Sequence, residues 1–511
     1  MRSLSKFEGR NVKFRFSLKG NSTHMRSLSK FEVPNIKFGL SLKGERIMIN
    51  ISKESFYEKK NSENVFSLIS EFRGDEITPI KIFDGFKGSR RFIFESGTKE
   101  NYFGRYSFMG ENPYKEICGD GQEEIDELKK ETKIKFDKST NSFSFKGGAI
   151  GYMGYDSIQL YEKKLNFKNK DELNVPIIRF NLYDRYICYD HFTHKVYIID
   201  NILKNDNREY DEIISSQNEY INSLLYKPTL TEPSEEKKDI SFKVHTSKED
   251  YIEKVNQAKE HILAGDIFQV VLSQRMTCET QKSYFEIYRR LREENPSPYM
   301  FLIDYDTYQI IGSSPESLVS VKGEKVITNP IAGTRKRGET PKIDSALEKE
   351  LMEDKKELAE HVMLVDLGRN DIGKVSKIGS VNVSDFMKIE KFSHVMHITT
   401  KVVGDIKETH DAFDAIAACL PAGTVSGAPK IRAMEIIEDL EEFKRGIYSG
   451  AVGYFSYGGD MDVAIALRTL ILKGKTAYLQ AGAGIVYDSV PETEFEEVQN
   501  KLMVLKEALR W

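Results

Sequence analysis

Short runs of alternating hydrophobic and polar residues fill the first part of the chain, up to about residue 226. Such runs, when rich in aromatic and β-branched residues and bounded by turn residues, are typical of strands. Residues 206–225 instead predict a helix, and the polar, proline-containing stretch 227–247 predicts a linker. Strands are predicted at 91–95 (RFIFE), 149–152, 183–190 and 195–200 (KVYIID).

The chain beyond the linker opens with a predicted helix that ends at Gly265. Ser247 is a residue type that caps helices, and the acidic residues that follow it suit the positive end of the helix dipole. A strand is expected next, at 267–276. Its alternation places one set of residues on a common face: Gln269, Val271, Ser273 and Arg275.

The remaining pattern predicts further strands and three helices. Strands are expected at 299–304, 309–312, 317–321, 325–328, 398–404, 450–457, 463–472 and 476–480, and helices at 345–365, 429–442 and 491–509. Because tight turns separate neighbouring strands, the sheets should be mainly antiparallel. The sequence therefore predicts a mixed α+β fold with large sheets.

Composition narrows the class of protein. The chain has 511 residues, 40% hydrophobic and 30% charged, with a formal net charge of −4, which is typical of a globular protein and gives no sign of nucleic-acid binding. It contains no apolar run of about 18 residues, so no membrane span is expected. Four cysteines without CxxC spacing argue against a disulfide framework or zinc site and favour a reducing, cytoplasmic location.

The first 47 residues contain a tandem duplication. Residues 1–8 (MRSLSKFE) recur at 25–32, and the segment holds 11 Lys and Arg against 3 Glu and no Asp. A targeting leader has such a composition, but a short, mostly disordered extension ahead of a start at Met48 is the better interpretation. The predicted organisation is an extension (1–47), an N-terminal domain (48–226), the linker (227–247) and a C-terminal domain (248–511).

Two predicted helices each carry glutamates three residues apart. Glu357 and Glu360 lie in KELAEHVMLVD, and Glu494 and Glu497 lie in ETEFEEVQNK, so each pair shares one helix face. If the two faces meet, they offer the oxygen ligands that Mg²⁺ prefers. Either pair alone is more often a solvated helix surface.

Several features suit an anionic ligand. Residues 421–430 (PAGTVSGAPK) lead into a helix and 481–484 (AGAG) follow a strand, so backbone amides could approach an anion there. For either stretch taken alone, a tight turn is the better interpretation. Arg468 lies within the apolar run VAIALRTLIL, where a buried arginine needs an anionic partner. Tyr448 and Thr334 are candidates for neutral hydrogen bonds to the same ligand.

Two residues are candidates to carry protons. Glu316 lies in GSSPES, at a predicted turn between strands, from which a carboxylate can point into a cleft. His397 lies in SHVMHITT, although a lone histidine in such a segment is more often structural than catalytic. Carboxyl and imidazole groups are common general acids and bases in enzymes.

The second half also contains motifs at 329–338 (NPIAGTRKRG), 357–375 (ELAEHVMLVDLGRNDIGKV), 420–437 (LPAGTVSGAPKIRAMEII), 448–456 (YSGAVGYFS), 466–470 (ALRTL) and 481–501 (AGAGIVYDSVPETEFEEVQNK). In this order they resemble the chorismate-utilising enzymes, a family of anthranilate, aminodeoxychorismate, isochorismate and salicylate synthases. The resemblance covers about residues 48–511. It implies a β-sandwich of large antiparallel sheets flanked by helices, in which the C-terminal domain binds chorismate and the N-terminal domain is regulatory.

The resemblance implies roles for individual residues. Mg²⁺ is expected to bind two glutamates directly, Glu360 and Glu497, with Glu357 and Glu494 in support. The expected catalytic residues are Glu316, as the general acid for departure of the C4 hydroxyl of chorismate, His397, which assists the loss of pyruvate, and Thr424. Substrate contacts are expected from Gln269, Gly333, Thr334, Tyr448, Arg468, Gly482, Gly484 and Lys501.

Two positions separate the branches of this family. Isochorismate and salicylate synthases use a lysine to activate water where this chain has Gln269, and many aminodeoxychorismate synthases carry a lysine where this chain has Ala332. A glutamine cannot act as that base, so ammonia is the expected nucleophile. The reaction implied is addition of ammonia at C2 with loss of the C4 hydroxyl, followed by elimination of pyruvate to form an aromatic ring.

The resemblance also implies a partner and an inhibitor. The chain has no glutaminase signature, so ammonia is expected from a separate glutamine amidotransferase small subunit. Residues 92–96 (FIFES) resemble the family's regulatory LLES motif, although a plain edge strand is the alternative interpretation. Tryptophan is expected to bind and inhibit near Glu95, Ser96, Arg105, Pro298, Tyr299 and Met300.

Two other functions stay open on the sequence alone. One is an aminodeoxychorismate synthase that lacks its lysine, and the other is a non-catalytic, tryptophan-binding regulatory subunit. Product analysis separates the first, and Mg²⁺-dependent release of pyruvate separates the second. The presence of every expected catalytic residue argues against a pure binding protein.

Overall fold

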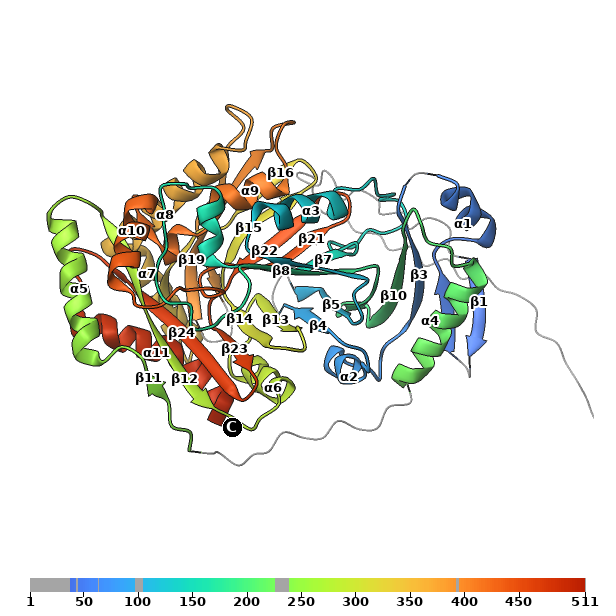
Figure 1. Ribbon diagram of the computed structural model, residues 1–511, viewed down its shortest axis with the longest axis horizontal. Helices are drawn as coiled ribbons and strands as arrows, with labels where there is room; N and C mark the ends of the chain where they lie inside the picture. Colours follow the sequence, from blue (N-terminus) through green and yellow to red (C-terminus); the bar gives the residue numbers. More distant parts are fainter. Residues whose placement is uncertain are drawn as a thin grey trace, which may run out of the picture.

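Two antiparallel sheets dominate the fold, and helices cover their outer faces (Figure 1). The computed structural model describes residues 37–42, 45–62, 64–96, 104–225, 239–391 and 395–510. This architecture confirms the predicted α+β class with large, mainly antiparallel sheets.

The larger sheet takes strands from almost the whole length of the chain. In spatial order it contains β1 (Lys37–Leu42), β2 (Glu45–Ile49), β3 (Phe66–Arg73), β10 (Lys195–Ile202), β9 (Arg185–Asp190), β5 (Tyr106–Gly110), β4 (Phe92–Glu95), β13 (Tyr299–Asp304), β14 (Gln309–Ser314), β23 (Thr469–Lys473), β24 (Thr476–Ile485), β12 (Gln269–Glu279) and β11 (Lys243–Val244). The short β20 (Gly427–Ala428) pairs with the start of β12.

The second sheet also combines strands from distant parts of the chain. Its spatial order is β17 (Ile331–Lys336), β19 (Val395–Asp405), β16 (Lys325–Thr328), β15 (Ser317–Lys322), β22 (Met461–Ile465), β21 (Ala451–Ser456), β7 (Gly148–Met153), β8 (Ile178–Tyr183) and β6 (Lys115–Gly119). In addition, β18 (Asn382–Lys391) pairs with β19.

Helices flank both sheets. They are α1 (Lys53–Lys60), α2 (Pro79–Asp84), α3 (Gln122–Thr132), α4 (Tyr210–Leu225), α5 (Lys248–Leu263), α6 (Tyr284–Glu294), α7 (Pro341–Glu353), α8 (Lys355–Gly373), α9 (Ala412–Cys419), α10 (Lys430–Leu440) and α11 (Pro491–Arg510), with 3-10 turns η2 (Tyr155–Leu160) and η3 (Gly423–Val425). In Figure 1, α3 and α9 lie above the sheets, and α2 and α6 lie below them. None of the helices in the described ranges is both long and apolar enough to cross a membrane.

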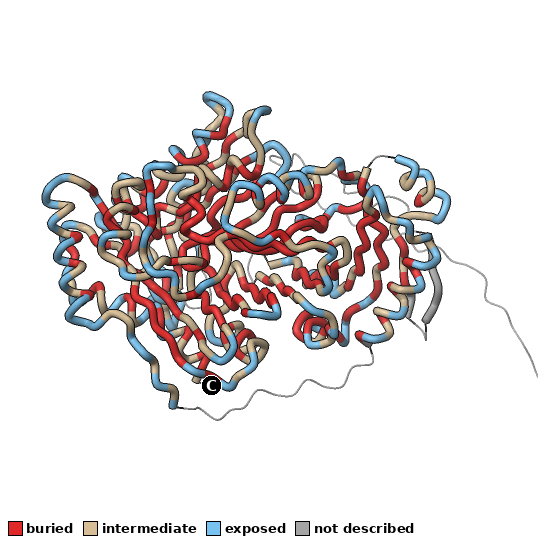
Figure 2. The backbone as a smooth tube through the Cα atoms, in the orientation of Figure 1, coloured by how far each residue is buried: buried red, intermediate tan, exposed pale blue. Residues whose placement is uncertain are grey.

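A hydrophobic layer between the two sheets makes the fold a sandwich. Its members come from both inner faces and include Phe92, Phe108 and Phe301 on the larger sheet and Ile150, Tyr152 and Val452 on the second. Figure 2 shows that the buried residues follow the strands, whereas exposed residues gather on outer loops and helix surfaces. Because aromatic side chains bury large apolar areas, this layer contributes strongly to stability.

Both sheets run through both predicted domains. In the larger sheet β4 pairs with β13, and in the second sheet β7 pairs with β21. Segments 48–226 and 248–511 therefore share two sheets and the hydrophobic layer between them. The predicted linker ends in β11, which pairs with β12 at the edge of the larger sheet.

Part of the N-terminal extension forms strands, which differs from the predicted disorder of residues 1–47. The strands β1 and β2 make an antiparallel hairpin, and β2 also pairs with β3. Apolar residues alternate with polar or small ones in KFGLSL, and this pattern suits an edge of a sheet. Residues 1–36, which include both copies of MRSLSKFE, lie outside the described residues.

Two predicted elements are each divided in the structure. The helix predicted at 345–365 is two helices, because the side chain of Asp354 accepts hydrogen bonds from backbone N–H groups and caps the start of α8. The strand predicted at 463–472 is β22 and β23, which belong to different sheets. Arg468 lies in the connection between them with a φ of 45°, so its prediction as a residue inside a strand is wrong.

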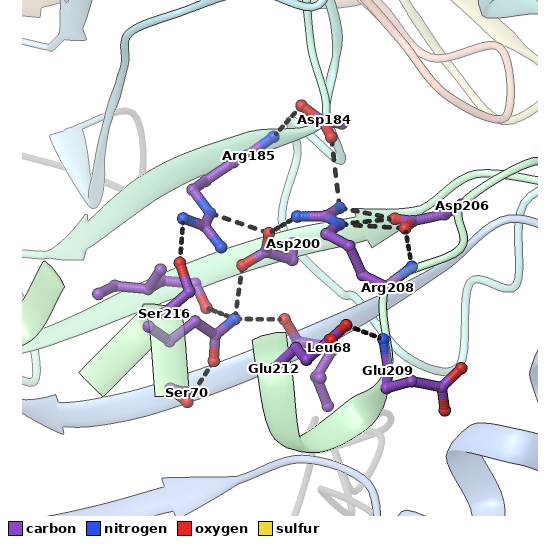
Figure 3. A network of polar contacts seen from close by, with 12 residues as sticks. Leu68, Ser70, Asp184, Arg185, Asp200, Asp206, Arg208, Glu209, Glu212 and Ser216 are labelled. Carbon is purple, nitrogen blue, oxygen red and sulfur yellow. Dashed lines mark hydrogen bonds and ion pairs between the residues drawn. The ribbon is translucent and has the colours of Figure 1, made fainter. Parts of the chain in front are cut away.

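A buried carboxylate holds α4 against the larger sheet. Asp200 of β10 is fully buried and accepts hydrogen bonds from Arg185 (2.9 Å), Arg208 (2.9 Å) and Gln217 of α4 (2.8 Å), in the network shown in Figure 3. A cavity of about 300 Å³ opens beside this network, against Arg185 and Arg208. No residue predicted to bind chorismate or tryptophan lines it.

Candidate active site

Glu316 lies in the short connection from β14 to β15, where the chain passes from one sheet to the other. Its carboxylate accepts a hydrogen bond of 2.9 Å from the hydroxyl of Thr424. Burial raises the pKa of Glu316 to about 7, although this hydrogen bond and Lys501 both act to lower it. A substantial fraction of Glu316 is therefore protonated near neutral pH, as a general acid requires.

The segment that carries Thr424 is built from small residues so that it can approach its neighbours closely. Thr424 lies in η3, and a Cβ added at Gly423 would lie 1.7 Å from the side chain of Leu367 in α8. The next residues form β20, where Ala428 is the register partner of Gln269. The predicted anion-binding stretch 421–430 therefore connects Glu316 to the start of β12.

His397 of β19 faces β17. Its Nδ1 atom lies 3.1 Å from the carbonyl oxygen of Gly333 and 3.0 Å from the hydroxyl oxygen of Thr334. Because a carbonyl only accepts hydrogen bonds, Nδ1 carries the hydrogen and Nε2 is unprotonated when the ring is neutral. Burial lowers the pKa of His397, and the charge of Arg468 lowers it further. The ring is therefore suited to take up a proton at Nε2.

Arg468 is a half-buried cation without an anionic partner among the described residues. Its guanidinium group donates a hydrogen bond of 3.2 Å to the side-chain oxygen of Asn295, which is neutral. Burial lowers the pKa of Arg468, and no neighbouring carboxylate opposes that effect. Because an anion would stabilise a half-buried guanidinium group, Arg468 remains a candidate to bind an anionic ligand.

Gly482 and Gly484 lie inside β24, paired with β12, so the prediction of an AGAG loop after a strand is wrong. A Cβ at Gly482 would lie 3.0 Å from the hydroxyl of Tyr448, and one at Gly484 would lie 2.7 Å from the amide nitrogen of Gln269. These glycines therefore leave room for two polar side chains against the strand. Lys501 of α11 donates a hydrogen bond of 2.9 Å to the carbonyl of Gly482.

The four predicted metal ligands lie on α8 and α11. Burial raises the pKa of Glu360, and the negative charges of Glu357 and Glu497 raise it further, which places one helix pair within electrostatic reach of the other. Burial also raises the pKa of Glu494. In the described part of the chain, no three acidic, histidine or cysteine side chains lie close enough to hold a metal ion together.

Two of these glutamates are paired with cations of the chain itself. Arg335 lies 3.2 Å from Glu357, and Lys501 lies 2.7 Å from Glu497. All four ligands offer carboxylate oxygens, which suit Mg²⁺, and a divalent cation would relieve the repulsion that raises the pKa of Glu360. The donor chemistry therefore fits the predicted metal.

The residues predicted for tryptophan lie around the junction of β4 and β13. Glu95 is buried and is the register partner of Met300, and Ser96 follows it directly. The carboxylate of Glu95 accepts a hydrogen bond of 2.7 Å from the hydroxyl of Tyr288 and lies 3.0 Å from Nε of Arg292. The carboxylate of Glu95 is therefore already neutralised by residues of α6.

The other predicted tryptophan contacts point in different directions. Tyr299 and Met300 are neighbours in β13, so their side chains point to opposite faces of the sheet. Tyr299 faces the second sheet, where its hydroxyl donates a hydrogen bond of 3.3 Å to Asp462 of β22. Pro298 is half-buried just before β13. Arg105 pairs with Asp190 at 2.8 Å and stacks on Tyr106.

Sequence reasoning overlooked two arginines that hold the site together, Arg335 and Arg445. Arg335 follows Thr334 directly and pairs with Glu350 and Asp354 as well as Glu357. Arg445 is almost fully buried just before Tyr448. Their positions in the sequence could have identified them, since each lies inside or beside a motif that contains other candidate site residues.

The chorismate binding enzyme family matches residues 89–507, and the chain belongs to this family. It is therefore an enzyme of the chorismate-utilising class. The chain is 46% identical over 474 residues to anthranilate synthase component 1 from Acetivibrio thermocellus, an alignment that covers 87% of this chain and 95% of that protein.

Two solved structures have the same fold. The crystal structure of anthranilate synthase component I from Streptococcus pneumoniae TIGR4 matches with a TM-score of 0.73 and 41% identity, covering 85% of this chain and 98% of that one. The menaquinone-specific isochorismate synthase from Escherichia coli matches with a TM-score of 0.69, covering 89% of this chain and 98% of that one. Its 17% identity makes it a likeness of fold alone.

Proposed function

We propose that this chain is the synthase component of an anthranilate synthase, which converts chorismate and ammonia to anthranilate and pyruvate. The observation that carries the proposal is Arg468, a half-buried guanidinium group whose hydrogen bond goes to a neutral amide. Such a group calls for an anionic substrate, and chorismate has two carboxylates. The identity to proteins named anthranilate synthase component 1 supports the choice of reaction.

In the first step Glu316 gives its proton to the C4 hydroxyl of chorismate. The C4–O bond breaks as water leaves, both ring double bonds shift by one position, and the electron pair of ammonia forms the new bond at C2. The resulting ammonium group then gives up one proton to solvent. A pKa of about 7 keeps Glu316 protonated often enough for this role. Gln269 has no basic nitrogen, so the site offers no side chain there that could activate water in place of ammonia.

In the second step His397 removes the proton at C2 through Nε2. The C–H electrons form a ring double bond, the C3–O bond breaks, and the enolpyruvyl group leaves and becomes pyruvate. The carbonyl of Gly333 fixes the ring tautomer by accepting from Nδ1. The gain of aromaticity makes this elimination favourable.

The remaining residues bind and orient the dianion. Arg468 would pair with one carboxylate, and Tyr448 and Lys501 would add hydrogen bonds beside Gly482. Glu357, Glu360, Glu494 and Glu497 would hold Mg²⁺, which when bound supplies positive charge to a substrate carboxylate. Lys501 would then be released from Glu497 to face the substrate.

We further propose that glutamine supplies the ammonia through a partner amidotransferase subunit in the cytoplasm, and that tryptophan inhibits by binding near Glu95. The name component 1 of the relatives supports a second component. The buried Glu95, its polar contacts with Tyr288 and Arg292, and its pairing with Met300 support a ligand site near the junction of β4 and β13.

The deciding experiment is product analysis. Purified chain with chorismate, ammonium and Mg²⁺ should release pyruvate and fluorescent ortho-aminobenzoate in equal amounts, without an added lyase. Accumulation of 4-amino-4-deoxychorismate would instead identify an aminodeoxychorismate synthase. Tryptophan binding without any release of pyruvate would identify a regulatory subunit. Repeating the assay with glutamine, with and without a purified amidotransferase subunit, tests the source of ammonia.

A further inference from the structure

We propose that Arg445 is a positioning residue, which sets the geometry of the active site by joining β12, the η3 segment and Tyr448. This inference rests on the proposed function, because it assigns Arg445 a role in that same site. Arg445 lies between α10 and β21 and is 2% exposed. It is therefore placed behind the residues that would touch chorismate.

The guanidinium group of Arg445 reaches two separate segments of backbone. Nη1 donates a hydrogen bond of 2.6 Å to the carbonyl of Val425, and Nη2 donates one of 2.7 Å to the carbonyl of Val271. Val425 follows Thr424 directly, and Val271 lies two residues after Gln269. One side chain thus fixes the distance between the segment of Thr424 and the strand of Gln269.

A carboxylate completes this connection. Glu441 pairs with Arg445 through two contacts, 2.6 Å to Nη2 and 2.9 Å to Nε. The oxygen that accepts from Nη2 also accepts from the backbone N–H of Ser273 (2.8 Å) and from its hydroxyl (2.9 Å). The pair therefore binds β12 at two positions.

The planar guanidinium group of Arg445 also contacts two aromatic rings. Its guanidinium carbon lies 4.8 Å from the ring centre of Tyr155 and 5.7 Å from that of Tyr448. Tyr448 is the residue whose hydroxyl lies beside Gly482. Arg445 thus contacts the ring of a predicted substrate-binding residue while its edge holds two other elements.

Stability alone is a poor reason for such a group. Burying an ion pair is often no more favourable than packing apolar side chains of the same volume. A planar guanidinium group, by contrast, donates in several fixed directions at once, which a lysine ammonium cannot reproduce. The specific gain is therefore geometric: Val425 is held so that the adjacent Thr424 hydroxyl reaches Glu316 at 2.9 Å.

The test compares Arg445→Lys and Arg445→Ala with Arg179→Ala. Arg179 is a matched control, because it is also buried, pairs with Glu116 at 2.6 Å and lies over the rings of Tyr305 and Tyr308, yet makes no contact with the residues of the site. Circular dichroism and thermal melts establish that each variant folds. The kcat and KM for chorismate, and the pH profile of kcat/KM, are then measured with ammonium as the nitrogen source.

We expect kcat to fall about 100-fold in both Arg445 variants, the size of effect that misplacement of a catalytic group produces. The alkaline limb of kcat/KM should move to higher pH as the Thr424–Glu316 hydrogen bond weakens. Added guanidinium or methylguanidinium ions should restore part of the activity of Arg445→Ala, but not of wild type. Arg179→Ala should melt at lower temperature with wild-type kcat and an unmoved limb.

The inference is overturned if the Arg445 variants lose thermal stability like the control but keep wild-type kcat and an unmoved alkaline limb. Should Arg445→Ala fail to fold, Arg445→Lys alone decides through the same two measurements. A wild-type chain that makes no anthranilate contradicts the proposed function instead. The two failures are therefore distinguishable.

Discussion

The hydroxyl of Thr424 donates a hydrogen bond of 2.9 Å to the carboxylate of Glu316, although 108 residues separate them in the sequence. The two residues come from different parts of the sandwich, η3 and the β14–β15 connection. Since the bond stabilises the charged carboxylate, it limits how far burial raises the pKa of Glu316. The readiness of this acid to give up its proton is therefore set by the packing of the η3 segment.

The first prediction concerns that hydrogen bond. In Thr424→Val the donor is lost, so the pKa of Glu316 should rise above about 7. A hydrogen bond worth about 1 kcal/mol corresponds to a shift of roughly 0.7 pH units. The alkaline limb of kcat/KM, which requires protonated Glu316, should move upward by about that amount, with a lower kcat. An unmoved limb would show that Thr424 does not influence the acid.

The second prediction concerns the charge on Glu316 itself. Glu316→Gln should nearly abolish turnover, by about 100- to 10,000-fold, while chorismate still binds in calorimetry. Near-normal turnover of this variant would remove Glu316 from the mechanism.

The same variant should change stability in a pH-dependent way. The pKa of Glu316 is raised in the folded chain, so its favourable contribution is present below the unfolded value of 4.5 and is lost as the pH rises through about 7. Glu316→Gln should therefore be more stable than wild type at pH 8, by about 3 kcal/mol, and no more stable near pH 4.5. Urea unfolding at both pH values measures this difference.

The third prediction concerns the unpaired cation. Arg468→Gln removes a half-buried charge that no anion balances among the described residues, so the variant should be more stable than wild type by about 1 kcal/mol. Chorismate binding should weaken at least 100-fold, because the substrate carboxylate loses its partner. Thermal melts and calorimetric titration test both effects. A destabilised variant with unchanged affinity would mean that Arg468 is a structural residue.

The fourth prediction concerns Mg²⁺. Glu360→Gln and Glu497→Gln should each raise the Mg²⁺ concentration needed for half-maximal activity at least tenfold, because each removes a charged oxygen ligand. Glu353→Gln is the matched control, since Glu353 ends α7 on the exposed surface and pairs only weakly with Lys349, at 3.8 Å. Binding of Mg²⁺ measured directly by calorimetry gives a readout independent of turnover. Equal titrations for all three variants would contradict the ligand assignment.

Local signals predicted much of the secondary structure and failed where tertiary contacts decide. Ser247 caps α5 as predicted, with its hydroxyl accepting from the N–H of Asp250. The break at Arg468 was missed, because the apolar run VAIALRTLIL continues through it while the chain crosses between sheets. The sequence pattern ends the strand before AGAG, because glycines carry no side chain to continue the alternation. In the sheet, close contacts with β12 and Tyr448 require these glycines.

The candidate site was predictable in its parts but not in its connections. Motif residues such as Glu316, Thr424 and His397 were identified from the sequence, because each lies in a distinctive stretch. The partners that orient them were not, since neither the Thr424–Glu316 bond nor the contacts of Arg445 leave any periodic trace in the chain. The family resemblance identifies the candidate catalytic residues, whereas burial and long-range packing set the pKa and the orientation of their side chains.

The pairing of β4 with β13 has a mechanical consequence. Glu95 is opposite Met300, the next residue back is Tyr299, and Tyr299 is opposite Ser314 at the end of β14. Only Pro315 then separates Ser314 from Glu316. A molecule that changes the pairing of β4 with β13 at Glu95 would therefore displace the backbone next to Glu316. Only Met300, Tyr299, Ser314 and Pro315 connect the two positions.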